Sequence, residues 1–190
     1  GRIVAATDPG MVTLDRSGER WFRALRAMRA EGRRGVDLQD LSLSPEAGGV
    51  RAVAFSSPIV DAQGRFLGAV TARVGLSQLE DVFARTVATF QMQRGGVGKV
   101  EWQFVSREGT VIADSVLREE GQVNLKREGL PSALLSETAG PGYVEEQHLR
   151  RHVPVITGFA RTEGYGEFPG FQWGVLVRMD RDDVLAPIRS

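Results

Sequence analysis

The pattern of hydrophobic and polar positions changes period along the chain, and these periods predict its elements. Apolar side chains first recur at helical spacing: Trp21, Phe22, Leu25 and Met28. We predict a helix here, with Ser17 as its N-cap, Glu19 in its first turn and Gly32 as its end. Strands are then expected over 50–60 and 65–74, because the Asp-Ala-Gln-Gly segment between them has hairpin-turn composition.

A second helix is predicted directly after this hairpin. Ser77 and Glu80 have the spacing of a capping box. Its apolar face contains Leu79, Phe83, Val87 and Phe90. The helix is expected to end near 94–96, an Arg-Gly-Gly segment that is the best candidate for a domain boundary.

The sequence contains an internal echo. Residues 1–7 resemble residues 109–115. In the second copy the segment reads as the return arm of a hairpin, after a strand over 100–105 and a turn over 106–109. In the first copy the chain starts at the turn glycine, so we expect a fragment of a longer protein that lacks the outgoing strand.

The rest of the chain predicts a second module of similar plan. We expect a short helix around 132–137, strands near 143–148, 155–160 and 172–178, and a final helix from about Asp180. Hairpin, helix and hairpin in this order favour antiparallel sheets covered by helices over a parallel βαβ fold. The predicted fold class is therefore α+β, with two tandem modules.

Composition narrows the function. Lys and Arg total 24, as do Asp and Glu, so there is no net charge to hold nucleic acid. The chain has no cysteine, which excludes disulfides and thiolate metal sites. No stretch approaches the roughly 20 apolar residues that span a bilayer. Any membrane attachment is therefore expected in segments outside this chain.

Three stretches resemble the double Cache family, the PAS-like extracytoplasmic sensors of histidine kinases, chemoreceptors and diguanylate cyclases. They are Arg20-Trp21-Phe22, residues 55–70 continuing into 76–79, and residues 164–178. The resemblance implies two PAS-like modules, each a mostly antiparallel sheet flanked by helices. Residues 1–94 would form the membrane-distal module, without its N-terminal helix and first strand, and residues 95–190 the membrane-proximal module.

The resemblance also implies a function. The chain would be the periplasmic ligand-sensing domain of an inner-membrane receptor, with a histidine kinase as the favoured output domain. The domain itself would be a binding module without catalytic residues, metal or cofactor. Its partners would be a small-molecule ligand and, in the full-length receptor, a second copy of the chain.

The predicted hairpin suggests where a ligand binds. If Val60 pairs with Arg65, one sheet face carries an apolar set suited to a core: Val53, Phe55, Ile59, Phe66, Val70 and Ala72. The other face carries Ala52, Ala54, Ser56, Ala69, Thr71 and Arg73. Because most of these are small, we expect this face to border a cavity walled by Trp21. The predicted ligand-binding residues are Trp21, Phe22, Ser56, Thr71 and Arg73.

Arg73 sets the expected ligand class. In relatives that bind amino acids, an aspartate commonly lies near the end of this strand and meets the ligand's ammonium group. A guanidinium at this position favours a carboxylate or another small anion instead. The alternative is that Arg73 pairs with Asp37 or Asp40, or faces solvent.

Two other functions stay open. His148 and His152 have the spacing of helical metal ligands, which would suit a metal-dependent hydrolase, although Val153-Pro154 favours extended backbone there. Nothing in the sequence assembles a nucleophile, a base and an oxyanion hole. The domain would alternatively act through a partner protein or through dimer contacts, without a small ligand.

Overall fold

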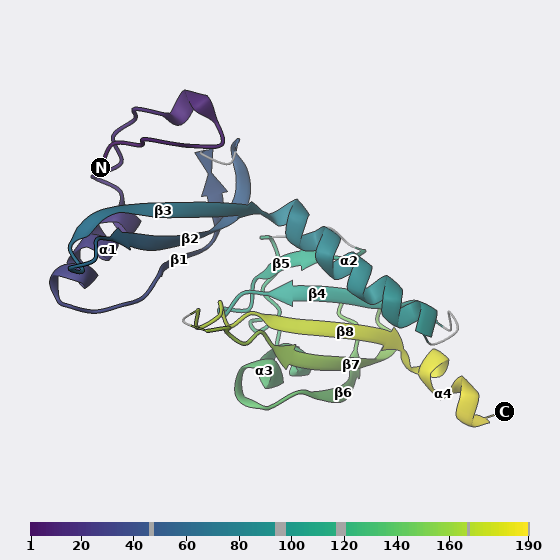
Figure 1. The fold of residues 1–190 in the computed structure, drawn as a ribbon. Helices are drawn as coiled ribbons and strands as arrows, with labels where there is room; N and C mark the ends of the chain where they lie inside the picture. Colours follow the sequence, from purple (N-terminus) through teal and green to yellow (C-terminus); the bar gives the residue numbers. More distant parts are fainter. Residues whose placement is uncertain (46–47, 94–97, 117–120, 167, 190) are drawn as a thin grey trace. The chain divides into compact units, whose positions relative to one another are not determined.

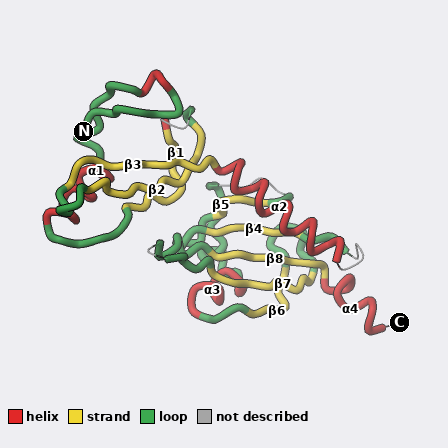
Figure 2. The backbone as a smooth tube through the Cα atoms, in the orientation of Figure 1, coloured by secondary structure: helices red, strands yellow, loops and turns green. Residues whose placement is uncertain are grey.

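The computed structural model describes residues 1–45, 48–93, 98–116, 121–166 and 168–189 (Figure 1). The chain folds into two compact units, Gly1–Leu76 and Ser77–Ser190. Each unit contains its own antiparallel sheet with helices against it (Figure 2). The α+β fold class is thereby confirmed. The predicted module boundary, Arg94-Gly95-Gly96, lies outside the described residues and stays a prediction.

The first unit contains a three-stranded antiparallel sheet in the order β1-β2-β3. Its elements are the 3-10 helix η1 (Pro9–Met11), α1 (Arg20–Ala30), β1 (Asp37–Ser44), β2 (Val50–Val60) and β3 (Phe66–Gly75). The predicted hairpin strands are confirmed. β1 was not predicted, because its sequence Asp-Leu-Gln-Asp-Leu-Ser-Leu-Ser is polar for a strand and only pairing with β2 stabilises it.

Helix α1 forms where its apolar spacing predicts it. Trp21 and Leu25 are buried. Gly32 follows the helix in a left-handed conformation, φ +72°, while the next N–H bonds back to Met28 O, as in a Schellman-type end. The predicted N-cap Ser17 is wrong: Glu19 occupies that position, and Ser17 N–H instead donates to Asp15 Oδ1.

The hairpin register differs from the predicted one. Val60 pairs with Phe66 and not with Arg65, and a register irregularity precedes it. The Asp61 carboxylate accepts hydrogen bonds from two turn N–H groups, those of Gln63 and Arg65, which fixes a wider turn. Beyond the irregularity Ser56 faces Thr71, where the prediction had Ala69. A shift of two residues leaves each side chain on its predicted sheet face.

The second unit contains a five-stranded antiparallel sheet in the order β5-β4-β8-β7-β6. The strands are β4 (Glu101–Val105), β5 (Val111–Asp114), β6 (Gly142–Gln147), β7 (Pro154–Arg161) and β8 (Gly174–Asp180). The helices are α2 (Leu76–Gln93), α3 (Pro131–Thr138) and α4 (Arg181–Arg189). All of these elements were predicted to within a few residues.

Helices cover both faces of this larger sheet. Phe83 of α2 stacks on Phe104 of β4 at 3.6 Å between ring centroids and meets Trp102 edge-on. Ser136 of α3 approaches Gly174 on the opposite face, where a Cβ would lie 2.7 Å from its Oγ. The apolar core on the α3 side contains Val105, Val111, Leu125, Leu130, Ala133, Phe159 and Leu176.

Helix α2 starts one residue earlier than predicted. It begins at Leu76, so Ser77 lies inside its first turn and the predicted capping box is wrong. Leu79, Phe83 and Val87 are half-buried, as their spacing predicts, whereas Phe90 is 40% exposed. No helix within the described residues is long and apolar enough to cross a membrane.

The internal echo corresponds to a shared backbone pattern. The N–H of Ile3 donates to the carbonyl of Leu14, eleven residues later, and the N–H of Val111 donates to that of Val123, twelve residues later. The carbonyls of Ile3 and Val111 each accept from the N–H ten residues later. The carbonyls of Gly1 and Gly109 each accept one further N–H from the segment before the next helix. The strand order β1-β2-β3 also repeats β6-β7-β8. The two units are therefore variants of one plan.

Candidate functional site

The predicted site residues of β2 and β3 lie together on the sheet face that α1 covers. Asp37, Ser56 and Thr71 form one cross-strand row, and Ala54 faces Arg73 in the next. Ser56 is 1% exposed, and its Oγ donates to Thr71 Oγ1 at 2.9 Å. Arg20 of α1 binds Asp37 with both guanidinium Nη atoms, at 3.1 and 2.9 Å. This ion pair holds the start of α1 beside the row.

The opposite face of this sheet is not the core that its apolar residues predict. Val53 is buried, but Ile59 and Val70 are 48% and 56% exposed. The covered face instead carries the small residues Ala52, Ala54 and Ser56, all buried. Small side chains allow a helix to approach the sheet closely, so α1 packs on this face although the other is more hydrophobic.

Trp21 and Phe22 project from the first turn of α1. Trp21 is 6% exposed, and its indole N–H is buried without a hydrogen-bond partner among the residues that the structure describes. The Phe22 ring meets Trp21 and Phe66 edge-on, at 5.7 and 5.6 Å between centroids. A buried indole N–H is normally bonded, because leaving it unpaired costs about 1–3 kcal/mol. Trp21 therefore supplies an unused donor inside the first unit.

Arg73 is half-buried beside Ala54 and has an interaction of its own. Of the two carboxylates considered as its partners, Asp37 is bound bidentately by Arg20. Bidentate geometry occupies both carboxylate oxygens. Arg20 is thus committed to a structural ion pair.

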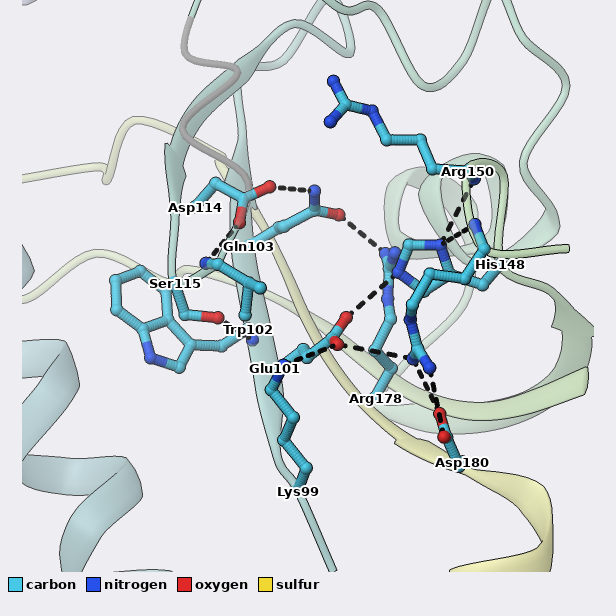
Figure 3. A network of polar contacts seen from close by, with 12 residues as sticks. Lys99, Glu101, Trp102, Gln103, Asp114, Ser115, His148, Arg150, Arg178 and Asp180 are labelled. Carbon is cyan, nitrogen blue, oxygen red and sulfur yellow. Dashed lines mark hydrogen bonds and ion pairs between the residues drawn. The ribbon is translucent and has the colours of Figure 1, made fainter. Parts of the chain in front are cut away.

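The second unit contains a buried polar network that sequence reasoning did not predict (Figure 3). Arg178 of β8 is 4% exposed and donates from Nη2 to Gln103 Oε1 at 2.7 Å. Gln103 Nε2 in turn donates to Asp114. Burial lowers the pKa of Arg178, while the nearby carboxylates of Glu146, Glu101 and Asp114 oppose that shift. The network therefore buries charged groups of β5 and β8, Asp114 and Arg178, within the second unit.

His148 joins this network instead of forming a metal site. Its Nε2 contacts Glu101 Oε2 at 3.0 Å, and its Nδ1 accepts from the backbone N–H groups of Arg150 and Arg151 at 3.3 Å. Both ring nitrogens are therefore occupied by protein groups. Burial lowers the pKa of His148, against the pull of Glu101. His152 is exposed and left-handed, φ +50°. Among the described residues no cluster of three metal-ligating side chains occurs.

The same network reaches the helices of the unit. Glu146 accepts hydrogen bonds from Ser132 N–H and Oγ, at 2.9 and 2.8 Å, and thereby caps the first turn of α3. Arg151 binds Asp180, the residue before α4, at 3.0 and 2.6 Å. In β4, polar side chains alternate with Trp102 and Phe104, and this alternation was a sequence signal for the network. It did not identify the partners of these side chains, because they lie 11 to 75 residues away.

Comparison with solved structures identifies the same architecture in bacterial receptors. The extracellular domain of the proposed histidine kinase rpHK1S-Z16 has a TM-score of 0.57 at 16% identity, over 95% of this chain and 66% of that one. The ligand-binding domain of the Pseudomonas fluorescens chemoreceptor CtaA, in complex with L-alanine, has a TM-score of 0.57 at 16% identity, over 95% and 67%. That of Campylobacter jejuni Tlp3, in complex with L-norvaline, has 0.60 at 9%, over 92% and 57%.

These likenesses show a shared fold, and the chain spans about two thirds or less of the solved chains. No curated protein matches the sequence. The family assignment comes from the sequence itself, which matches the Cache domain family dCache_1 over residues 1–188. The chain therefore belongs to the Cache domain family, and as a Cache sensor domain it is a binding module.

Proposed function

We propose that this chain is the periplasmic sensor of an inner-membrane receptor, with a histidine kinase as its output domain, and that the first unit binds a small anion. The ligand would lie between α1 and the covered face of β2 and β3. The observation that carries the proposal is the Trp21 indole N–H, a buried donor without an acceptor. In the receptor the chain would act as a homodimer.

The chemistry around Trp21 supports an anionic ligand. Arg73 and the Ser56–Thr71 hydroxyl pair share the covered face. An indole N–H and a guanidinium are both donors, and a carboxylate or oxyanion is an acceptor for each. The Asp37 carboxylate on this face is neutralised by Arg20. Arg73, which has an interaction of its own, is the cation among the predicted site residues.

The solved relatives support a small ligand with a carboxylate. CtaA and Tlp3 were solved with L-alanine and L-norvaline. Such zwitterions also need an acceptor for their ammonium group. At the position where relatives commonly have an aspartate acceptor, the predicted site of this chain has Arg73, a donor. We therefore propose carboxylates or inorganic anions over amino acids. Binding would stabilise one arrangement of the unit, and that bias would pass through the chain to the output.

The first test is a thermal-shift screen against monocarboxylates, dicarboxylates, amino acids and inorganic anions. A ligand at about 100 times its Kd should stabilise the folded chain by about 2.7 kcal/mol. Arg73→Gln should lose most of this shift. Trp21→Phe keeps a large ring but removes the N–H, and should weaken binding by about tenfold. Arg26→Gln, an exposed position of α1, is the matched control and should bind normally.

Three outcomes contradict the proposal. Equal stabilisation of the parent and Arg73→Gln by amines or zwitterions excludes an anion site at Arg73. Equal stabilisation of the parent and Trp21→Phe excludes the indole N–H as a ligand donor. If no compound stabilises a chain that circular dichroism shows to be folded, a partner protein or dimer contacts become the better explanation of sensing.

A further inference from the structure

A basic hollow lies in the second unit, lined by other residues than the network around Arg178. It has a volume of about 50 Å³. Side chains from three segments line it: Arg107 from the β4–β5 turn, Lys126 and Glu137 from around α3, and Arg161 at the end of β7. Three cations and one carboxylate leave a charge of +2 around a space of a few water volumes.

The cations are held in place by the protein. Lys126 Nζ donates to Arg107 O at 2.6 Å and to Glu137 Oε2 at 2.8 Å. Arg161 donates from Nε to Ser136 O at 3.2 Å and from Nη1 to Gln172 Oε1 at 3.3 Å. These two contacts orient Arg161 without neutralising it, because Ser136 O and Gln172 Oε1 are uncharged oxygens. The Arg107 guanidinium lies at the exposed rim.

Two further observations favour a binding site here. Lys126, Arg161 and Arg107 all lower the pKa of Glu137, so their positive potential reaches the one carboxylate of the hollow. Gln172, which orients Arg161, is one of three non-glycine residues at positive φ within the described chain, at +59°. Such backbone is strained and concentrates at functional sites.

We propose that this hollow binds the oxyanion head of a small dianionic ligand such as a phosphate monoester or inorganic phosphate. A charge of +2 matches a phosphate dianion, and guanidinium groups bind its oxygens in pairs. A second hollow of about 310 Å³ adjoins the first, since Arg161 and Gln172 line both. The organic part of a monoester would lie there, against Thr162 and the backbone of Gly140 and Gly164.

The test uses the whole chain and phosphate as the probe. Amide NMR spectra are recorded during titration with inorganic phosphate and then with glycerol phosphate, against sodium chloride at equal ionic strength. We expect saturable shifts confined to the segments around Arg107, Lys126, Glu137 and Arg161. Arg161→Gln and Arg107→Gln should each raise the Kd about tenfold. Arg127→Gln removes an exposed charge next to Lys126 and should leave the Kd unchanged.

Arg107→Gln keeps the proposal testable if Arg161→Gln unfolds, because the Arg107 guanidinium makes no bond that holds the fold among the described residues. Glycerol phosphate binding more tightly than phosphate indicates a monoester ligand, and equal affinity indicates the free anion. Shifts that chloride reproduces, or that Arg127→Gln loses as strongly as Arg107→Gln, overturn the site. Arg73→Gln separates this site from the first unit, because it should not affect the phosphate shifts.

Discussion

At the scale of single residues, His148 shows how partners decide what a side chain can do. By spacing, His148 and His152 resemble a metal pair. In the fold, Nδ1 of His148 accepts backbone N–H groups and Nε2 faces Glu101, so the neutral ring with its proton on Nε2 satisfies every contact. If Nδ1 were protonated, it would become a third donor, facing the two backbone N–H groups from which it now accepts. The charged groups that face the ring are Glu101, Arg178, Arg151 and Asp180.

This arrangement predicts a pH dependence of stability. The pKa of His148 is lowered in the folded state, so the unfolded state binds the proton more tightly. The stability that the neutral His148 ring contributes is therefore complete above about pH 6.5. It is lost as the pH falls through the folded-state pKa of His148, and the loss is about 1.4 kcal/mol for each pH unit that separates the folded-state from the unfolded-state pKa. Urea unfolding at about pH 7.5 and about pH 5.5 measures this loss.

We expect the parent to lose more stability between these two pH values than His148→Gln does. His152→Gln is the matched control, because His152 is exposed and the chain has no third histidine. Its loss should equal that of the parent. If His148→Gln also loses as much as the parent, other groups carry the pH dependence and His148 is not its source.

At the scale of elements, helix α1 combines a predicted end with an unpredicted start. The end follows from Gly32, whose positive φ is available to glycine at little cost. The start has no side-chain cap: Glu19 is the N-cap residue and makes no cap hydrogen bond with its side chain, while Ser17 lies in the preceding turn, where its N–H donates to Asp15 Oδ1. Helix ends fixed by backbone conformation are readable from sequence. A helix start without a side-chain cap offers no such local signal.

Gly32→Ala should lower the free energy of unfolding by about 1 kcal/mol, because alanine is strained at φ +72°. Space does not enter, since nothing lies within 4 Å of the added Cβ. Gly18→Ala is the matched control: its Cβ also meets nothing within 4 Å, and its φ is not positive. Equal effects of the two substitutions on the urea midpoint would show that backbone strain is not the cause.

At the scale of the whole molecule, α2 connects the two units. It continues directly from β3, the last strand of the first unit, and its Phe83 packs on Phe104 and Trp102 of the second. Contacts of Phe83 with β4 therefore hold α2, the helix that follows β3 in the chain, against the sheet of the second unit.

Phe83→Ala should detach α2 from this sheet. Loss of a stacked, half-buried ring predicts a cost of about 2 kcal/mol and faster hydrogen exchange along α2, with the exchange of β7 and β8 little changed. Phe90→Ala is the control on the same helix, where the ring is 40% exposed, and should cost less than half as much. Faster exchange throughout the second unit would instead mean that Phe83 supports the whole core.

Sequence alone determined the strands other than β1, the α-helices and the repeated plan, because hydrophobic period, turn residues and the echo of 1–7 in 109–115 are local signals. It also determined which side chains share a face of the β2–β3 hairpin. Tertiary structure decided which face α1 covers, because close approach of a helix depends on small residues as well as on hydrophobicity. It also decided the partners of Arg178 and His148, which lie 75 and 47 residues away along the chain, and the contact of Arg161 with Gln172.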